Sequence, residues 1–316
     1  MARSPLTQVA VSGRAPRAAA QRPAVIHLLI SLRPEQWTKN LFVFAALIFA
    51  QRLDDPGSVL RVAGAFAVFC ALSGVVYLFN DVADRRTDAS HPVKARRPIA
   101  SGALSPRTAM MAAIVIGVPA LAAAWWLRPT FALVAAAYLL LMALYSGPLK
   151  HVVIIDVLAI SIGFVLRVFA GAVVIDVPVS HWLLVCTILL ALFLALSKRR
   201  HELVLLADGA KGHRRILQEY SPYLLDQMIG VVTASTLMAY MLYATSPETA
   251  ERFGTSLLGL TIPFPLYGIF RYLYLVHHKE GGGSPSELLL TDRPLLVCVA
   301  LWGVTVALII YRPLGI

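Results

Sequence analysis

The stretch 77-YLFNDVADRRTDASHPVKARRPIASG-102 carries the strongest chemical signal in this chain. It follows an apolar run, and Asn80, Asp84 and Asp88 are spaced by four residues, so they share one face if a helix continues through them. Carboxylates on adjoining turns repel one another unless cations lie between them. The spacing therefore predicts a helix end that binds cations.

Hard oxygen ligands at this density suit Mg²⁺, which commonly joins one or two carboxylates to substrate phosphates. The predicted metal ligands are Asn80, Asp81, Asp84 and Asp88. Lys94 and Arg97 follow directly, and cations beside a carboxylate–metal cluster predict a diphosphate that is held from both sides. The alternative is a solvated loop whose acids and bases neutralise one another. The helical spacing at the edge of an apolar run favours the metal site.

Apolar runs of about 20 residues, the length that crosses a bilayer, recur along the rest of the chain. We expect nine spans in one bundle, at roughly 34–50, 58–80, 107–127, 130–146, 153–174, 181–198, 227–246, 256–275 and 294–312. Apolar residues make up 58% of the 316 residues, and charged residues only 14%. This composition excludes a soluble nucleic-acid-binding protein and a disordered polycation, in spite of a net charge of +11. The sequence predicts an all-α, polytopic membrane protein.

The basic residues are distributed unevenly along this pattern. Most of the 28 Lys and Arg residues lie in the N-terminal tail and in the loops after the second, fourth, sixth and eighth predicted spans. The positive-inside rule then places the N-terminus and these loops in the cytoplasm, and an odd number of spans places the C-terminus outside. We therefore expect a protein of the bacterial plasma membrane whose active site faces the cytoplasm.

The chain ends and the cysteines add little chemistry. Residues 1–25 contain no acid and are rich in Arg, Ala, Ser and Pro, so we expect a disordered basic tail before one membrane domain over 26–316. Cys70, Cys186 and Cys298 fall in separate apolar runs without metal-binding spacing. They are expected to be small buried side chains.

A second polar cluster, residues 196–220, follows the sixth predicted span. It begins with Lys198, Arg199 and Arg200, and its cations outnumber its acids, which favours binding of phosphate oxygens over a second metal ion. Positive-inside topology explains part of this charge. Lys198 and Arg199, at the very edge of the span, are predicted to contact substrate.

Other predicted substrate contacts come from further segments on the same side of the membrane. They are Lys39, Asn40, Tyr77, Tyr145, Lys150 and Arg167. Ionisable groups beside or inside an apolar run normally face the protein interior or a watery cavity. Arg167, about 16 Å along the helix from Asp156, is therefore expected to point into the bundle, in either a substrate-binding or a purely structural role.

Together these motifs resemble a known family. Asn80-Asp81-x-x-Asp84-x-x-x-Asp88, followed by His91-Pro92-x-Lys94-x-x-Arg97-Pro98, is similar to the first Asp-rich motif of the UbiA-type intramembrane prenyltransferase superfamily. Within it, the chain most resembles the branch of decaprenyl-phosphate phosphoribosyltransferases. The further similar stretches are 33-RPEQWTKN-40, 145-YSGPLKH-151, 167-RVFAG-171 and 197-SKRRHEL-203.

The resemblance implies a Mg²⁺-dependent transfer of 5-phosphoribose from phosphoribosyl pyrophosphate to a polyprenyl phosphate, with release of pyrophosphate. Such a product serves the synthesis of cell-envelope glycolipid and arabinan precursors. The resemblance makes Asp81, Asp84 and Asp88 the catalytic residues, because they would hold the metal that stabilises the leaving diphosphate.

Three alternatives remain open from the sequence. Transfer of a prenyl group from its diphosphate to an aromatic or lipid acceptor shares the metal site. Family members of that kind usually carry a second Asp-x-x-x-Asp after the sixth span, where this chain has Lys198-Arg199-Arg200-His201-Glu202. A transporter predicts ionisable residues near the middle of several spans, and Arg167 is the main candidate here. A non-catalytic scaffold leaves the ordered acids unexplained.

Overall fold

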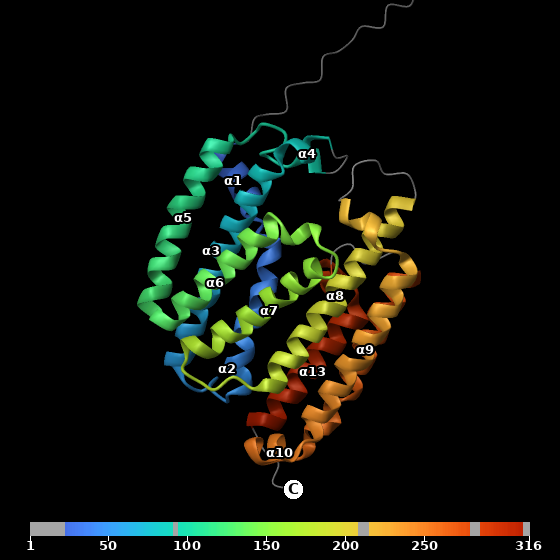
Figure 1. Cartoon of the computed structure of the whole chain (residues 1–316). Helices are drawn as coiled ribbons and strands as arrows, with labels where there is room; N and C mark the ends of the chain where they lie inside the picture. Colours follow the sequence, from blue (N-terminus) through green and yellow to red (C-terminus); the bar gives the residue numbers. More distant parts are fainter. Residues whose placement is uncertain (1–22, 91–93, 208–214, 279–284, 312–316) are drawn as a thin grey trace, which may run out of the picture.

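The computed structural model describes residues 23–90, 94–207, 215–278 and 285–311, and these residues form helices and no strand (Figure 1). The α-helices are α1 (Ala24–Leu32), α2 (Ala45–Phe49), α3 (Pro56–Ala83), α4 (Arg85–Ala89), α5 (Pro106–Leu127), α6 (Pro129–Ser146), α7 (Ile155–Val174), α8 (His181–Ala207), α9 (Pro222–Thr245), α10 (Pro247–Phe253), α11 (Pro263–His278), α12 (Pro285–Thr291) and α13 (Arg293–Tyr311). The 3₁₀ helices are η1 (Pro34–Phe44), η2 (Lys94–Arg96), η3 (Leu149–His151), η4 (Arg215–Glu219) and η5 (Leu257–Thr261).

Seven of the described helices are long and apolar enough to cross a membrane, namely α3, α5, α6, α7, α8, α9 and α13. The described residues offer an eighth candidate if α10 and Leu257–His278, a pair bent by 103°, form one broken span. The predicted count of nine is therefore not confirmed. The difference lies in the predicted span 34–50, where the polar residues between Pro34 and Asn40 interrupt the apolar run and the chain forms η1 and the short α2.

The N-terminal region also differs from its prediction. Residues 1–22 of the predicted tail lie outside the described residues, but Ala24 and Val25 already belong to α1. Helix α1 packs against α3, and Figure 1 shows α1 and α4 at one end of the molecule, with α2 and α10 at the opposite end. We call the end that carries α1 and α4 the upper end.

The two largest hydrophobic cores of the described residues join most of the helices. The first joins η1, α2, α3, α5, α6 and α7, and it contains the rings of Phe69, Phe131 and Tyr138. The second joins α7, α8, α9, α11 and α13, around Phe193 and Tyr272. Helices α7 and α8 pack along each other and connect the two halves of the chain.

A close backbone contact positions η1 against α7. At Gly171 an added Cβ would lie 1.9 Å from the carbonyl oxygen of Val43, which is too close for any side chain. Because the obstructing atom belongs to the backbone of η1, it cannot rotate away. Gly171 therefore allows η1 to pack directly on α7, and this packing sets where Lys39 and Asn40 lie.

Gly171→Ala should force η1 and α7 apart and lower the free energy of unfolding by about 1–3 kcal/mol, the usual cost of overpacking. The measurement is the apparent melting temperature of the purified protein in detergent. Gly303→Ala in α13 is the matched control, because an added Cβ there meets no heavy atom within 4 Å. Equal melting temperatures for the two variants would contradict the close contact.

Candidate active site

The acids of the 77–102 stretch lie at the upper end of α3, where α4 and η2 follow it. The backbone hydrogen bonds continue through the junction, since Asp84 N donates to Asn80 O and Asp88 N donates to Asp84 O, each at 2.8 Å. Asp84 itself forms the break between the two helices. The predicted continuation of the helix is thus present with a bend at Asp84.

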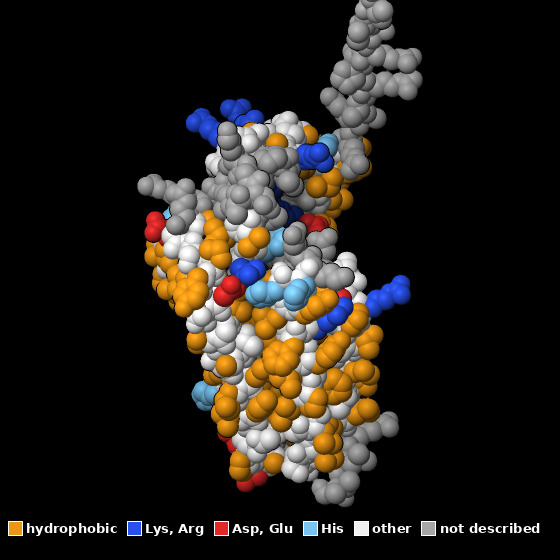
Figure 2. Space-filling model, turned by 90° about the vertical axis from the view of Figure 1, so that its right-hand side faces the viewer, with side chains coloured by type: hydrophobic (Ala, Val, Ile, Leu, Met, Phe, Trp, Pro, Cys, Tyr) orange, Lys and Arg blue, Asp and Glu red, His pale blue; other side chains and the backbone are white. Residues whose placement is uncertain are grey.

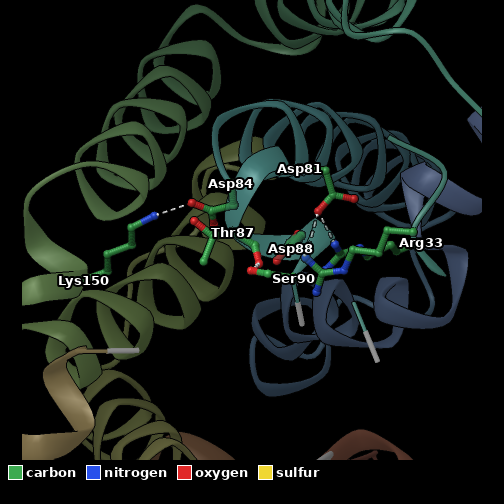
Figure 3. A network of polar contacts seen from close by, with 8 residues as sticks. Arg33, Asp81, Asp84, Thr87, Asp88, Ser90 and Lys150 are labelled. Atoms are coloured by element: carbon green, nitrogen blue, oxygen red, sulfur yellow. Dashed lines mark hydrogen bonds and ion pairs between the residues drawn. The ribbon is translucent and has the colours of Figure 1, made fainter. Parts of the chain in front are cut away.

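Each of the three carboxylates is paired with a cation from another segment. Arg97 Nη1 donates to Asp88 at 2.6 Å and to Asp81 at 3.2 Å, and Arg33 also donates to Asp81. Lys150 Nζ donates to Asp84 at 2.9 Å. Figure 3 shows Asp81 pointing toward Arg33, whereas Asp84 points the other way, toward Lys150. The Asp-rich stretch is therefore already neutralised by three basic side chains.

Asp81 and Asp88 are the pair that fits a shared metal ion. Both side chains are buried, at 2% and 4% exposure, and both contact the same nitrogen of Arg97, so they can share one cation between them. Two carboxylates completed by water and substrate phosphates are a usual Mg²⁺ site. In the described part of the chain no three acidic, His or Cys side chains gather closely enough to hold one ion. The predicted set of four ligands is thus not assembled, because Asp84 is turned to Lys150.

A group of cations lies beside these carboxylates. Lys39 of η1 interacts electrostatically with Lys198 of α8 and with Arg33 and Arg167, against the single opposing charge of Glu35. The Arg33 guanidinium also lies over the Tyr77 ring, 4.6 Å from its centroid. Positive charge from distant parts of the chain is therefore concentrated near the acids, as expected for a site that receives phosphate groups.

Arg199 has a different position from the one predicted. Its side chain is 2% exposed, and all of its nitrogens have protein acceptors: Nε donates to Asp156 at 2.8 Å, Nη1 to Glu202 at 2.6 Å and Nη2 to the Tyr145 hydroxyl at 3.2 Å. Burial of a guanidinium is tolerated only with such compensation. Arg199 and Tyr145, both predicted to contact substrate, thus form a buried framework of protein contacts beside the site. Lys198, one residue earlier, is 43% exposed and lies 4.0 Å from Glu202.

Arg167 and Asn40 form a second buried framework. Arg167 points into the bundle as predicted, where Nε donates to Asn40 at 2.7 Å, Nη1 to the Gly163 carbonyl at 2.8 Å and Nη2 to Tyr138 at 3.0 Å. The amide nitrogen of Asn40 lies 3.3 Å from Ser73 Oγ, and Asn40 is fully buried. Arg167 and Asn40, both predicted to contact substrate, make contacts that join η1 to α3, α6 and α7.

Three partners that the structure brings in are not among the residues predicted to bind metal or substrate. Arg33 contacts Asp81 from a left-handed backbone conformation with φ 53° at the end of α1. Asp156 is fully buried and binds both Arg199 and the Tyr220 hydroxyl, which donates to it at 2.8 Å. The same hydroxyl accepts a hydrogen bond from Ile154 N at 2.7 Å. An ionisable residue at the edge of an apolar run was the available signal for Asp156, but Tyr220 had none.

The apolar helices, with a charged site at their upper end, define an integral membrane protein. Residues 40–291 match the UbiA prenyltransferase family. The chain therefore belongs to the UbiA prenyltransferase family, and it is a membrane-bound transferase by that membership.

Curated relatives and solved structures agree with this assignment. The chain is 33% identical over 309 residues to the decaprenyl-phosphate phosphoribosyltransferase of Mycolicibacterium smegmatis, covering 94% of this chain and 96% of that relative. It is 30% identical over 293 residues to the protein of the same name from Corynebacterium glutamicum, covering 90% and 86%. Its fold is similar to that of a UbiA homologue from Archaeoglobus fulgidus bound to GPP and Mg²⁺, with a TM-score of 0.68, 18% identity and coverage of 90% and 99%.

Tyr220→Phe should lower the free energy of unfolding by about 1–3 kcal/mol, because Asp156 loses a donor and Ile154 N loses its acceptor. Tyr223→Phe is the matched control, since Tyr223 is 74% exposed. Burial, with a smaller contribution from the Asp156 hydrogen bond, raises the pKa of Tyr220 from 10.0 to about 12. The loss of unfolding free energy in Tyr220→Phe, relative to wild type, should therefore have its full size below pH 10 and decline as the pH rises through about 12. Thermal unfolding in detergent measures it, and equal stability of the two variants would refute the anchoring role.

Proposed function

We propose that the chain transfers the 5-phosphoribosyl group of phosphoribosyl pyrophosphate to a polyprenyl phosphate, with release of pyrophosphate, at the cytoplasmic face of the plasma membrane. The observation that carries this proposal is that Asp81 and Asp88 share the guanidinium group of Arg97. Arg33 also pairs with Asp81, and Lys150 pairs with the neighbouring Asp84. Relatives with this activity in their names match almost the whole chain. The excess of basic residues at the upper end supports a cytoplasmic site.

The donor diphosphate fits the acidic and basic groups at the end of α3. The C1–O bond to the diphosphate breaks with its electron pair going to pyrophosphate, and an oxygen of the acceptor phosphate forms the new bond to C1. Asp81 and Asp88 would hold Mg²⁺, which supplies Lewis-acid stabilisation of the leaving diphosphate. Arg33 and Arg97 lie on these carboxylates and are placed to donate to diphosphate oxygens as negative charge develops there.

The remaining cations fit the two other phosphate groups, those of the ribose and of the lipid. Lys39 and Lys198 lie near enough to repel each other, and an anionic phosphate between them relieves that repulsion. A phosphate monoester is largely ionised near pH 7 because its second pKa is about 6. The acceptor therefore needs no general base, and none is assigned. Arg199 stabilises the position of Lys198, because its ion pair with Asp156 fixes the start of the polar cluster 196–220.

The basic start of the second loop favours phosphoribosyl transfer over prenyl transfer. A second acidic pair at this position would suit a second metal ion on a prenyl diphosphate. Lys198, Arg199 and Arg200 stand there instead. A phosphoribosyl donor carries one more phosphate, and the partly exposed Lys198 is the residue of the three that would meet it, because Arg199 and Arg200 pair with Asp156 and Asp226. The polyprenyl chain of the acceptor would remain in the bilayer beside the helices.

Purified protein in detergent, given radiolabelled phosphoribosyl pyrophosphate, Mg²⁺ and polyprenyl phosphate, should move the label into the organic phase. Omission of the polyprenyl phosphate should abolish the transfer, and removal of divalent cations with EDTA should do the same. Consumption of a prenyl diphosphate, with no transfer from phosphoribosyl pyrophosphate, would overturn the proposal and assign the chain to prenyl transfer.

Asp81→Asn and Asp88→Asn should each lower turnover by about a hundredfold or more, equal to ~2.7 kcal/mol of barrier. Both changes are isosteric, so the variants should fold, and their melting temperatures should change little while their turnover falls. Asp176→Asn is the matched control, because Asp176 pairs with Arg128 and its side chain is 76% exposed. Turnover near the wild-type value in both site variants would exclude these carboxylates from the reaction.

A further inference from the structure

A cavity of about 400 Å³ lies between α9 and α11, and it is separate from the site described above. Its lining includes Asp226, Gly230, Thr233, Phe270 and His277. Figure 2 shows the face of the molecule that includes α9, with an extensive apolar surface below a band of basic, acidic and His side chains. The cavity is open on one side, and both helices belong to segments that can cross a bilayer. Lipid is therefore the surrounding medium.

The wall of this cavity contains empty space and an unused hydroxyl. An added Cβ at Gly230 would meet no heavy atom within 4 Å. Thr233 is 8% exposed, and its hydroxyl has no hydrogen-bond partner among the described residues. The neighbouring hydroxyls of Ser235 and Thr236 donate to carbonyls one turn earlier in α9, at 2.9 Å and 2.7 Å. A buried hydroxyl without a partner is costly, which indicates a bound molecule at this wall.

Ionisable groups of three helices meet at the polar end of the cavity. His277 Nδ1 lies 2.9 Å from the carbonyl oxygen of Leu273, which can only accept, so Nδ1 carries a proton. Nε2 of the same ring lies 3.5 Å from Asp226 Oδ1. Arg200 of α8 also donates to Asp226. A carboxylate and a guanidinium at one end of an apolar cavity can receive a headgroup that carries both a positive and a negative charge.

We propose that this cavity binds an aminophospholipid, a lipid with a primary ammonium and a phosphate in its headgroup. The ammonium lies against Asp226, the phosphate faces Arg200, an ester carbonyl accepts a hydrogen bond from Thr233, and an acyl chain follows the wall along Gly230. This zwitterionic headgroup matches the charges of the Arg200–Asp226 pair. A polyprenyl phosphate brings only anionic oxygens, which Asp226 repels.

The first test compares three lipids with identical acyl chains on the full-length protein in detergent. Dioleoyl phosphatidylethanolamine should raise the apparent melting temperature by about 2–4 °C, because a ligand that binds only the folded state stabilises it. Dioleoyl phosphatidylcholine carries a methylated ammonium that cannot donate hydrogen bonds, and dioleoyl phosphatidylglycerol carries no ammonium. Both should give smaller shifts. Equal shifts with all three lipids would overturn the proposal.

Two variants assign the effect to the cavity. Gly230→Leu fills the empty space and should abolish the preference for phosphatidylethanolamine while the melting temperature without lipid stays close to wild type. Asp226→Asn should abolish the same preference. Asp292→Asn is its matched control, because it removes the same charge from an ion pair with Arg271 outside the cavity.

Three results would contradict the proposal. Asp226→Asn that keeps the preference for phosphatidylethanolamine would exclude the ammonium site. A larger stabilisation by polyprenyl phosphate, lost in Gly230→Leu, would assign the cavity to the isoprenoid chain. A change of oligomeric state in Gly230→Leu, measured by size-exclusion chromatography with light scattering, would assign it to a second copy of the chain. None of these measurements depends on the proposed transfer reaction.

Discussion

A charge inside an apolar helix bundle must be compensated by the protein itself, and this constraint organises the structure. Arg199 is compensated by Asp156 and Glu202, and Arg167 by an amide, a hydroxyl and a carbonyl. Glu202 and Gly163 belong to the same helices as the arginines that they contact, but Asp156, Asn40 and Tyr138 come from other segments, so their contacts also join two segments. The residues that make burial of charge tolerable are thus the residues that hold η1, α7 and α8 in place around the site.

The parts of the structure that depend on local periodicity could be predicted from the sequence. Helices α3 and α5 to α8 coincide with predicted apolar runs, because 20 apolar residues can satisfy their backbone groups in lipid only as a helix. The spacing of Asn80, Asp84 and Asp88 correctly indicated that the helix continues past the apolar run. The inward direction of Arg167 followed from the cost of exposing it to lipid.

The parts that depend on contacts between distant residues could not be predicted in the same way. Lys198 and Arg199 look equivalent in the sequence, yet Lys198 is partly exposed and Arg199 is buried. Asp156 makes the burial of Arg199 possible, and the sequence does not reveal this pair because Asp156 lies 43 residues earlier. The 3₁₀ helix η1 was predicted as part of an α-helical span, since hydropathy does not reveal that Gly171 brings α7 against its backbone. Spacing identifies which residues share a face, but not which face of another helix they meet.

The ion pairs at the end of α3 have a consequence for the proposed reaction. Asp81, Asp88, Arg33 and Arg97 neutralise one another without substrate, so the site does not hold unpaired charge in a region of low polarity. A diphosphate that arrives with a divalent cation brings one partner for the carboxylates and another for the guanidinium groups. The number of paired charges does not fall in this exchange. The free-energy cost of separating the existing ion pairs is therefore offset by new ion pairs of the same kind. Because a polyprenyl phosphate alone brings only negative charge, it cannot make this exchange at Asp81 and Asp88. The arrangement therefore favours this position for the donor diphosphate, and Lys39 and Lys198 remain for the phosphates of the ribose and of the lipid.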